Sequence, residues 1–313
     1  MKLIIQIPCY NEEETLPLTL QDIPREIPGV DKLELLIVDD GSTDDTVNIA
    51  KKYGVDHIIR HPRNMGLAKA FKTGLRACLE RGADIIVNTD ADNQYNAAYI
   101  PALIDPIVRG EYEFVIGARP IDATEDFSRL KKILQKIGSW TVRVASNTDI
   151  PDAPSGFRAI SRDCAMRLNV FNEYTYTLET IIQAGQKQIP ITWVRVRTNP
   201  KLRDSRLFKS IPAYVWRSFV TIVRIFVVYK SFRFFSLLAA IFFSVGFIGN
   251  LRFLYFYFTG DGGGHAQSLI LSASLVGVGI GFFTTALIAD MQSVNRTMLE
   301  EIRYKLLKEE LDG

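Results

Sequence analysis

The chain has 313 residues, of which 47% are hydrophobic, and its 37 lysines and arginines nearly balance its 35 aspartates and glutamates, for a net charge of +2. This is the composition of a globular protein with some extra apolar sequence, and it excludes a strongly basic nucleic-acid-binding protein. Three scattered cysteines, Cys9, Cys78 and Cys164, lack the spacing of metal ligands, so we expect small buried side chains rather than a zinc site.

The first third of the chain alternates apolar runs of strand length with helical patterns. Strands are predicted over residues 2–8, 33–38 and 57–60, and helices over 13–20, 45–53 and about 66–81. Strand, loop and helix in this order are typical of nucleotide-binding α/β units, whose ligands bind at the carboxyl ends of the strands.

Acidic and hydroxyl residues follow the second predicted strand. Asp39 stands where a carboxylate could accept hydrogen bonds from a ribose or a base, whereas Asp40 and Asp44 fit either that role or a simple turn. Ser42 or Thr43 is predicted to cap the helix that follows.

Two carboxylates separated by one residue follow a strand predicted over 84–87. Alternate side chains of an extended backbone share a face, so Asp90 and Asp92 are predicted to face one hard cation, with Gln94 on the same side. A lone pair of this spacing is more often a turn, but Lys69 could bring a phosphate contact to the same sheet edge from the first turn of its helix. The sequence therefore predicts a Mg²⁺ or Mn²⁺ site that also binds a diphosphate.

The middle of the chain continues the α/β pattern and then becomes basic. Further elements are predicted as helices over 99–108 and 177–184 and as strands over 113–116, 157–160 and 191–196. Residues 128–146 form a basic amphipathic helix pattern, which suits a solvated surface as well as an anionic membrane or lipid headgroup.

Two apolar runs near the C-terminus are long enough to cross a membrane, residues 234–258 and 268–289. Lysines and arginines precede the first run and follow the second, while the connection over 259–267 has none, so both termini are predicted to be cytoplasmic. Residues 211–226 show an amphipathic pattern suited to the membrane interface.

Four motifs in order, Pro8-Cys9-Tyr10-Asn11-Glu12 and residues 39–44, 64–70 and 90–94, resemble the family 2 glycosyltransferases. The likeness covers about residues 2–209. More narrowly, with Asp152 and Ser155-Gly156-Phe157-Arg158, the chain is similar to the dolichyl-phosphate mannose synthase and polyisoprenyl-phosphate glucosyltransferase branch. The resemblance implies a GT-A fold, a nucleotide-sugar donor, Mg²⁺ or Mn²⁺, and inverting transfer to polyprenyl or dolichyl phosphate.

The resemblance also assigns site residues. The nucleotide-binding positions are Pro8, Tyr10, Glu12 and Asp39, and Lys69 is added as a nucleotide contact because of its place in the first turn of its helix. The metal positions are Asp90, Asp92 and Gln94, and the catalytic positions are Asp90, Asp92, Asp152 and Arg119. The acceptor-phosphate positions are Arg119, Arg129 and Ser139. Arg206 is a further candidate, at a place where some relatives carry Gly-x-Ser-Lys and this chain has Arg203-Asp204-Ser205-Arg206 instead. Asp152 is expected to act as a base or to orient the acceptor, although a turn residue would look the same.

These expectations divide the chain into a GT-A domain (1–205), amphipathic juxtamembrane helices (206–232), two transmembrane helices (233–290) and a cytoplasmic C-terminal helix (291–313). UDP-glucose is the favoured donor and GDP-mannose the next. The alternatives are a processive polysaccharide synthase and a membrane-tethered nucleotide-sugar sensor without turnover. A homo-oligomer held through the transmembrane hairpin is a further arrangement that the sequence allows.

Overall fold

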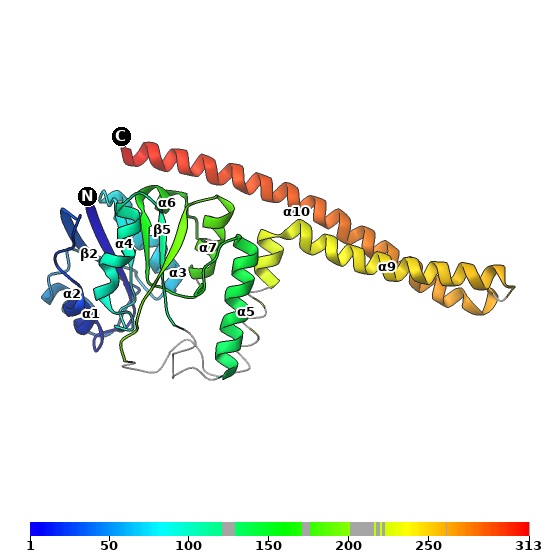
Figure 1. Ribbon diagram of the computed structural model, residues 1–313, viewed down its shortest axis with the longest axis horizontal. Helices are drawn as coiled ribbons and strands as arrows, with labels where there is room; N and C mark the ends of the chain where they lie inside the picture. The colour runs from blue at the N-terminus through cyan, green and yellow to red at the C-terminus, as the bar shows by residue number, and fades with distance from the viewer. Residues whose placement is uncertain are drawn as a thin grey trace. The chain divides into compact units, whose positions relative to one another are not determined.

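The computed structural model describes residues 1–120, 129–170, 176–200, 216, 220, 223–260 and 262–312. The chain divides into two units, of which unit 1 comprises residues 1–218 and 301–313, and unit 2 comprises residues 219–300. In Figure 1 the strands of unit 1 lie among its helices, and unit 2 consists of long helices.

Unit 1 is a mixed α/β structure, as the sequence predicts. Its strands are β1 (Lys2–Cys9), β2 (Lys32–Asp39), β3 (His57–Arg60), β4 (Ile85–Asn88), β5 (Phe114–Ala118), β6 (Arg158–Ser161) and β7 (Ile191–Arg195). Its helices are α1 (Leu16–Asp22), α2 (Thr46–Lys52), α3 (Leu67–Glu80), α4 (Ile100–Val108), α5 (Arg129–Ser146), α6 (Arg162–Arg167) and α7 (Thr177–Gln186), with a 3-10 turn η1 (Ala97–Tyr99).

The strands form one sheet in the order β3-β2-β1-β4-β6-β5-β7. Strand β6 is antiparallel to β4 and β5, and the other pairings are parallel. Because β1, β2 and β4 run in the same direction, their carboxyl ends meet at one edge of the sheet. The register pairs Cys9 with Asp39 and Gln6 with Asn88, which sets the loops after these strands side by side.

The core lies on both faces of this sheet. Residues 3–9 of β1 are buried throughout, as expected for a parallel strand covered on both sides. Leu3, Ile5 and Ile7 pack in one cluster with Leu35 and Val87. This continuous burial fixes the strand ends, and therefore the loops that carry the predicted site residues.

Three local predictions differ from the structure. Helix α1 begins at Leu16 rather than residue 13, with proline in its first turn. Neither Ser42 nor Thr43 caps α2, because the Ser42 hydroxyl accepts from Asn11 N and the Thr43 N–H donates to the Asn11 side chain. Helix α6 was not predicted; the Ser161 hydroxyl caps it by accepting from Cys164 N.

Unit 2 contains α9 (Ser231–Phe258), the 3-10 turn η3 (Gly262–His265) and most of α10 (Ala266–Asp312). Both long helices are apolar enough to cross a membrane, and only 11% and 17% of their most apolar windows are buried within the protein. A Cβ added at Gly246 would lie 2.7 Å from the Ser272 carbonyl oxygen, so the two helix backbones approach closely there. The two apolar C-terminal helices expected from the sequence are confirmed.

The end of α10 belongs to unit 1. The Tyr304 hydroxyl lies 2.5 Å from Asp163 Oδ1, and Glu310 forms an ion pair of 2.7 Å with Arg76 of α3. Leu307 is buried between these contacts along the helix. Residues 301–312 are therefore packed onto the α3 and α6 side of unit 1 by polar and apolar contacts together.

Candidate active site

The carboxylates Asp90 and Asp92 lie in a turn after β4, not in extended backbone as predicted. Residues 91 and 92 form the turn, and Asn93 has a left-handed φ of 53°. The Gln94 N–H donates to Asp92 Oδ1 at 3.1 Å, which closes the turn over the carboxylate. A hydrogen bond of 2.9 Å from Asn199 N to the Gln94 carbonyl oxygen ties this segment to the chain after β7.

Asp90 has an unusual electrostatic environment. Burial raises its pKa well above 3.8, the charge of Asp92 raises it further, and Arg119 and Arg158 oppose the rise. A Cβ on Gly156 would lie 2.9 Å from Asp90 Oδ2, so only glycine lets this loop approach the carboxylate. Among the described residues no hydrogen-bond donor is directed at Asp90, which leaves its oxygens free for a ligand.

Arg119 and Asp152 form a buried, forked ion pair beside this turn. Arg119 Nε lies 2.7 Å from Asp152 Oδ2, Nη2 lies 3.1 Å from Oδ1, and the backbone N–H of Arg119 also donates to Oδ2. Burial would lower the pKa of Arg119, but the nearby Tyr95, Asp152 and Asp90 outweigh it and raise the pKa above its usual value. The structure thus brings together two residues predicted separately for catalysis.

A buried polar network that sequence reasoning missed holds the loop around Gly156. Asn88 Nδ2 donates to the Gly156 carbonyl oxygen at 2.8 Å and to the Tyr176 hydroxyl at 2.9 Å, and its Oδ1 accepts from Gln6. The Gly156 N–H donates to the Tyr95 hydroxyl at 3.0 Å. The one signal in the sequence was the presence of amides, Gln6 and Asn88, in strands that are otherwise apolar.

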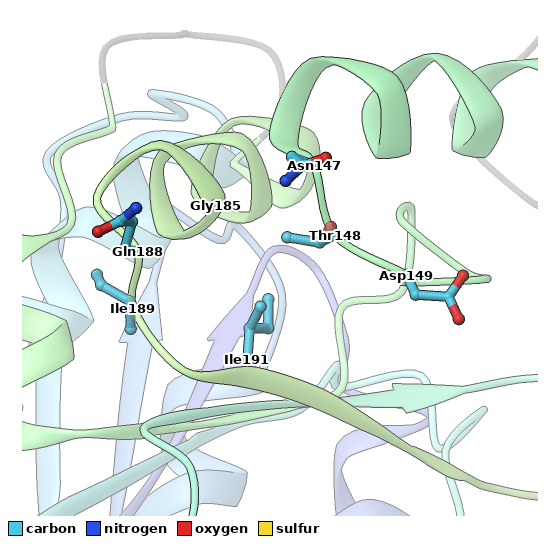
Figure 2. Close-up of a pocket in the computed structure, with 7 residues that line it drawn as sticks. All are labelled: Asn147, Thr148, Asp149, Gly185, Gln188, Ile189 and Ile191. Atoms are coloured by element: carbon cyan, nitrogen blue, oxygen red, sulfur yellow. The ribbon is translucent and has the colours of Figure 1, made fainter.

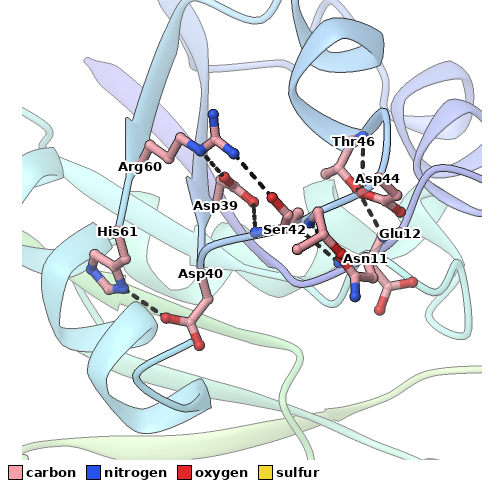
Figure 3. A network of polar contacts seen from close by, with 10 residues as sticks. Asn11, Glu12, Asp39, Asp40, Ser42, Asp44, Thr46, Arg60 and His61 are labelled. Atoms are coloured by element: carbon pink, nitrogen blue, oxygen red, sulfur yellow. Dashed lines mark hydrogen bonds and ion pairs between the residues drawn. The ribbon is translucent and has the colours of Figure 1, made fainter. Parts of the chain in front are cut away.

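The β2 end carries a second group of carboxylates, shown in Figure 3. Asp39 is fully buried, and its Oδ1 accepts from Ser42 N at 3.0 Å. Its Oδ2 lies 3.0 Å from Arg60 Nε but accepts no well-aligned hydrogen bond. Asp39 therefore keeps one buried carboxylate oxygen that a ligand could use.

Asp40 and Asp44, by contrast, are occupied by structural contacts. Asp40 pairs with His61 Nδ1 at 2.7 Å and accepts from the backbone N–H groups of Met65 and Gly66. Burial of Asp44 opposes ionisation, but hydrogen bonds from Thr46 and backbone N–H groups prevail and lower its pKa. Of the two roles predicted for Asp40 and Asp44, their contacts therefore fit the structural role in the turn.

A small depression of about 220 Å³ opens beside the β1 and β2 ends. Glu12 lines it, and the exposed Tyr10 precedes it, whereas Pro8 is buried within β1. Lys69 is exposed in the first turn of α3. The remaining lining residues of the depression are Asn11, Glu13, Glu14, Thr15, Thr43 and Asp44.

Three predicted acceptor positions lie farther along the chain. Arg206 lies outside the described residues, and for Arg129 only the backbone position at the start of α5 is described. Ser139 of α5 is buried, and among the described residues its hydroxyl has no hydrogen-bond partner. These positions remain predictions.

A larger depression, of about 400 Å³, lies at the C-terminal ends of α5 and α7 and contains none of the predicted site residues. Asn147, Thr148 and Asp149 form one side of it, and Gln188, Ile189 and Ile191 the other (Figure 2). Its lining has neither a buried charge nor paired carboxylates, so the chemistry points to the β4 end instead.

The donor set at the β4 end fits a hard divalent cation. Burial and the nearby charge of Asp92 both disfavour ionisation of Asp90, and a bound cation would offset these effects. Oxygen ligands are also the kind that Mg²⁺ and Mn²⁺ select. Within the described residues no group of three acidic, histidine or cysteine side chains is arranged to hold a metal ion, so substrate phosphate or water would have to supply further ligands.

Comparison with known proteins agrees with this geometry. Residues 4–168 match the model of the family described as Glycosyl transferase family 2. The chain is 29% identical over 209 residues to an undecaprenyl-phosphate mannosyltransferase of Micrococcus luteus, covering 62% of this chain and 84% of the relative. It is 30% identical over 225 residues to a dolichol-phosphate mannosyltransferase of Pyrococcus furiosus, covering 67% and 62%.

Among solved structures, the fold is similar to glucosyl-3-phosphoglycerate synthase from Mycobacterium tuberculosis, crystallised with Mn²⁺, UDP-glucose and phosphoglyceric acid. The TM-score is 0.56 at 20% identity, over 72% of this chain and 78% of the other. The GT-A fold is thereby confirmed for unit 1. Together with the family match, this makes the chain a glycosyltransferase, a member of family 2 in the branch of the dolichyl-phosphate mannose synthases and their polyisoprenyl-phosphate relatives.

Proposed function

We propose that this glycosyltransferase moves a hexose from a nucleotide sugar to polyprenyl or dolichyl phosphate, with inversion at the sugar carbon. The observation that carries the proposal is the juxtaposition of the Asp90 and Asp92 carboxylates with the buried Arg119–Asp152 pair. One group suits the donor diphosphate and its cation, and the other offers a guanidinium for an acceptor anion. Relatives named for transfer to undecaprenyl phosphate and to dolichol phosphate support the choice of a lipid phosphate.

The chemistry requires little proton transfer. A phosphate monoester is already anionic near neutral pH, so one of its oxygens can attack the sugar C1 without a general base. The bond from C1 to the diphosphate oxygen breaks, and its electrons leave with the nucleoside diphosphate. Asp90 and Asp92 would hold Mg²⁺ or Mn²⁺, and the cation would offset the charge that grows on the leaving diphosphate.

In this scheme Arg119 holds the acceptor and Asp152 positions Arg119. The forked contact with Asp152 fixes the guanidinium plane. Arg119 Cζ also lies over the Tyr95 ring, 5.7 Å from its centroid, and this cation–π contact limits the movement of the guanidinium further. Asp152 engages Nε and Nη2, so Nη1 and the second N–H of Nη2 would be the donors for the oxygens of an acceptor phosphate. Asp152 has both oxygens engaged by Arg119, which favours the orienting role over that of a base.

The contacts of Asp39 favour a uridine donor over a guanosine donor. Uracil presents one N–H between two carbonyl oxygens, whereas guanine presents two adjacent donors that need both oxygens of a carboxylate. Asp39 Oδ1 is engaged by Ser42 N, which leaves Oδ2 beside the exposed donor Arg60. One acceptor next to one donor matches uracil, so UDP-glucose remains the favoured donor and GDP-mannose the next.

The donor is tested directly with purified protein in lipid nanodiscs. UDP-glucose, GDP-mannose and other labelled nucleotide sugars are offered with undecaprenyl or dolichyl phosphate, with and without EDTA. We expect one donor to give labelled lipid, and EDTA to abolish the product. Hydrolysis or binding without any lipid product in the whole panel would favour the nucleotide-sugar sensor, and a water-soluble polymer would favour the polysaccharide synthase.

We also propose that α9 and the first part of α10 span the membrane as a hairpin with unit 1 on the cytoplasmic side. The connection between the runs lacks lysine and arginine, and the end of α10 packs within unit 1. A cysteine replacing Thr259 should therefore react with an impermeant reagent added to intact cells, while one replacing Glu309 should not. The reverse pattern would overturn the orientation.

A further inference from the structure

Helix α5 exposes apolar side chains on the face that does not pack on unit 1. Val142 and Ala145 are buried. On the other side Ile137, Trp140 and Val144 are 44%, 55% and 46% exposed. Among the described residues, α5 is the one helix of unit 1 with three large exposed apolar side chains, and an ordinary surface helix would place polar residues there.

Basic residues share this exposed face. Residues three and four positions from Trp140 are its neighbours on the helix surface, and these are Lys136 and Ile137 on one side and Arg143 and Val144 on the other. The helix sequence contains five lysines and arginines and no acidic residue (Arg129–Ser146, RLKKILQKIGSWTVRVAS). We call the residues Lys136, Ile137, Trp140, Arg143 and Val144 the α5 patch.

A tryptophan between aliphatic and basic side chains is the composition of a surface that enters a membrane interface. The indole and aliphatic groups enter the headgroup region, while the lysine and arginine bind anionic headgroups. The same chain carries two helices long enough to span a bilayer, so unit 1 would be covalently tethered to a bilayer that holds them. An acidic protein partner would match the charges but not the exposed indole and aliphatic groups.

We propose that the α5 patch is a second membrane contact of this chain, formed with the anionic lipid surface and separate from the apolar hairpin. The role of this contact rests on the proposed function. If the acceptor is a lipid phosphate, a membrane contact on the helix that carries the predicted acceptor positions Arg129 and Ser139 would hold that helix at the depth of the phosphate. Its physical test, however, does not depend on transfer activity.

The test places an environment-sensitive NBD probe on a cysteine at Val144 in the full chain. Cys9, Cys78 and Cys164 are buried, so the introduced cysteine is the reactive one, and the unmodified chain gives the background. The labelled protein is placed in nanodiscs of phosphatidylcholine alone or with phosphatidylglycerol, with and without a lipid that carries a quencher near the headgroup. A probe at the exposed Lys51 of α2 is the control.

We expect the probe at position 144 to be blue-shifted and quenched, more strongly in anionic discs, and the probe at position 51 to be unaffected. Lys136→Gln and Arg143→Gln should each lower the ratio of quenched to unquenched probe about fivefold in anionic discs, since each basic residue near such a surface contributes roughly that factor. Equal behaviour of the two probes would overturn the proposal. Cross-linking between two copies at position 144 without lipid quenching would overturn it too, and would assign the face to a second chain.

A kinetic variant separates this contact from the proposed chemistry. Trp140→Ala removes a half-exposed side chain, so the fold should be retained. We expect a higher KM for polyprenyl phosphate in anionic nanodiscs, with unchanged UDP affinity and an unchanged rate on a short, water-soluble prenyl phosphate. If no transfer is found with any substrate, the proposed function fails, but the quenching result still decides on the α5 patch.

Discussion

Two strand ends of the same sheet carry closely spaced aspartates, and their surroundings differ. After β2, Asp40 is held by His61 and two backbone N–H groups, so its charge is used to build the loop. After β4, Asp90 has no directed donor among the described residues, and burial beside Asp92 raises its pKa. A carboxylate with satisfied oxygens stabilises the fold, whereas a carboxylate without a directed donor beside a second one, as Asp90 is beside Asp92, gains from a bound cation.

This difference explains why the motif alone is ambiguous. Both loops are acidic, and both close through a backbone N–H donating to an aspartate two or three residues away, Gln94 to Asp92 and Ser42 to Asp39. The two loops differ in their neighbours. At the β2 end, neighbouring segments supply hydrogen-bond donors to the carboxylates. At the β4 end, the neighbours are Gly156 and the Arg119–Asp152 pair. Substitutions at the β4 end and at the β2 end should therefore have different consequences for activity and stability.

The largest effect should come from Asp92→Asn. The substitution keeps the shape of the side chain but removes one anionic oxygen ligand, so we expect transfer to fall on the order of 10²- to 10³-fold. Because the loss of charge also relieves the repulsion with Asp90, the thermal unfolding temperature should not fall. Initial rates over a Mn²⁺ titration and a thermal melt measure both effects. Near-normal activity at low Mn²⁺ would refute the metal assignment.

Arg119→Ala should affect both activity and stability. Asp152 is fully buried, and removal of the Arg119 guanidinium takes away the cation that offsets its charge, which costs about 3–5 kcal/mol. Transfer to polyprenyl phosphate should fall strongly, while the affinity for UDP measured with metal should change little, because the donor contacts are left in place. Arg119→Lys is the matched variant: it keeps the charge, and should recover stability better than transfer.

If Arg119→Ala lowered the affinity for UDP as much as it lowered transfer, the acceptor assignment would be contradicted. That result would place the guanidinium on the donor diphosphate rather than on the acceptor. The pair would then belong to the same site as Asp90, and the division between donor and acceptor contacts proposed above would be wrong.

The sequence predicted the sheet better than the site. The strands over residues 2–8, 57–60 and 191–196 were placed within one residue of the observed ends. Short runs rich in β-branched and aromatic residues predict strands whether they are buried, as β1 is, or partly exposed, as β3 and β7 are. Helix α6 was missed because six residues are too few to show a helical period. The unbroken α10 has a signal in the sequence, since residues 266–312 contain no proline.

Within the site, positions were predictable and partners were not. Asp90 and Asp92 are neighbours in the chain, so a motif can find them. Arg119 and Asp152 are separated by 33 residues and meet only because β6 returns antiparallel between β4 and β5. Asn88 was predicted as neither core nor site, because its bonds to Gly156 and Tyr176 exist only after the sheet has formed.

The opposite outcome is expected at the β2 end. Asp40→Asn replaces one acceptor oxygen by an amide donor that meets a donor N–H, so unfolding should become easier by about 1–3 kcal/mol. That corresponds to a fall of roughly 2–10 °C in the midpoint of thermal unfolding for a domain of this size. Turnover per folded molecule should be nearly unchanged. If Asp40→Asn abolished turnover without a change in the melt, the distinction between the two strand ends would fail.

The smallest effect concerns the other end of β2, where Glu34 lies among Lys2, Lys32 and His57 at 2.7–2.9 Å. Burial would raise the pKa of Glu34, but hydrogen bonds from these three side chains outweigh it and lower the pKa from 4.5 to about 2. A carboxyl with a lowered folded pKa adds stability above its unfolded pKa, and this stability is lost as the pH falls from about 4.5 towards 2. The full shift would correspond to about 3 kcal/mol. The side chain of Lys32 is 66% exposed and screened by solvent, so we expect about 1–2 kcal/mol.

Glu34→Gln should therefore be less stable than the parent at pH 7 by that amount and equally stable near pH 2, with unchanged transfer activity at pH 7. Urea unfolding of both proteins across this range measures the difference, and a gap that persisted at pH 2 would show that packing rather than charge makes Glu34 stabilising.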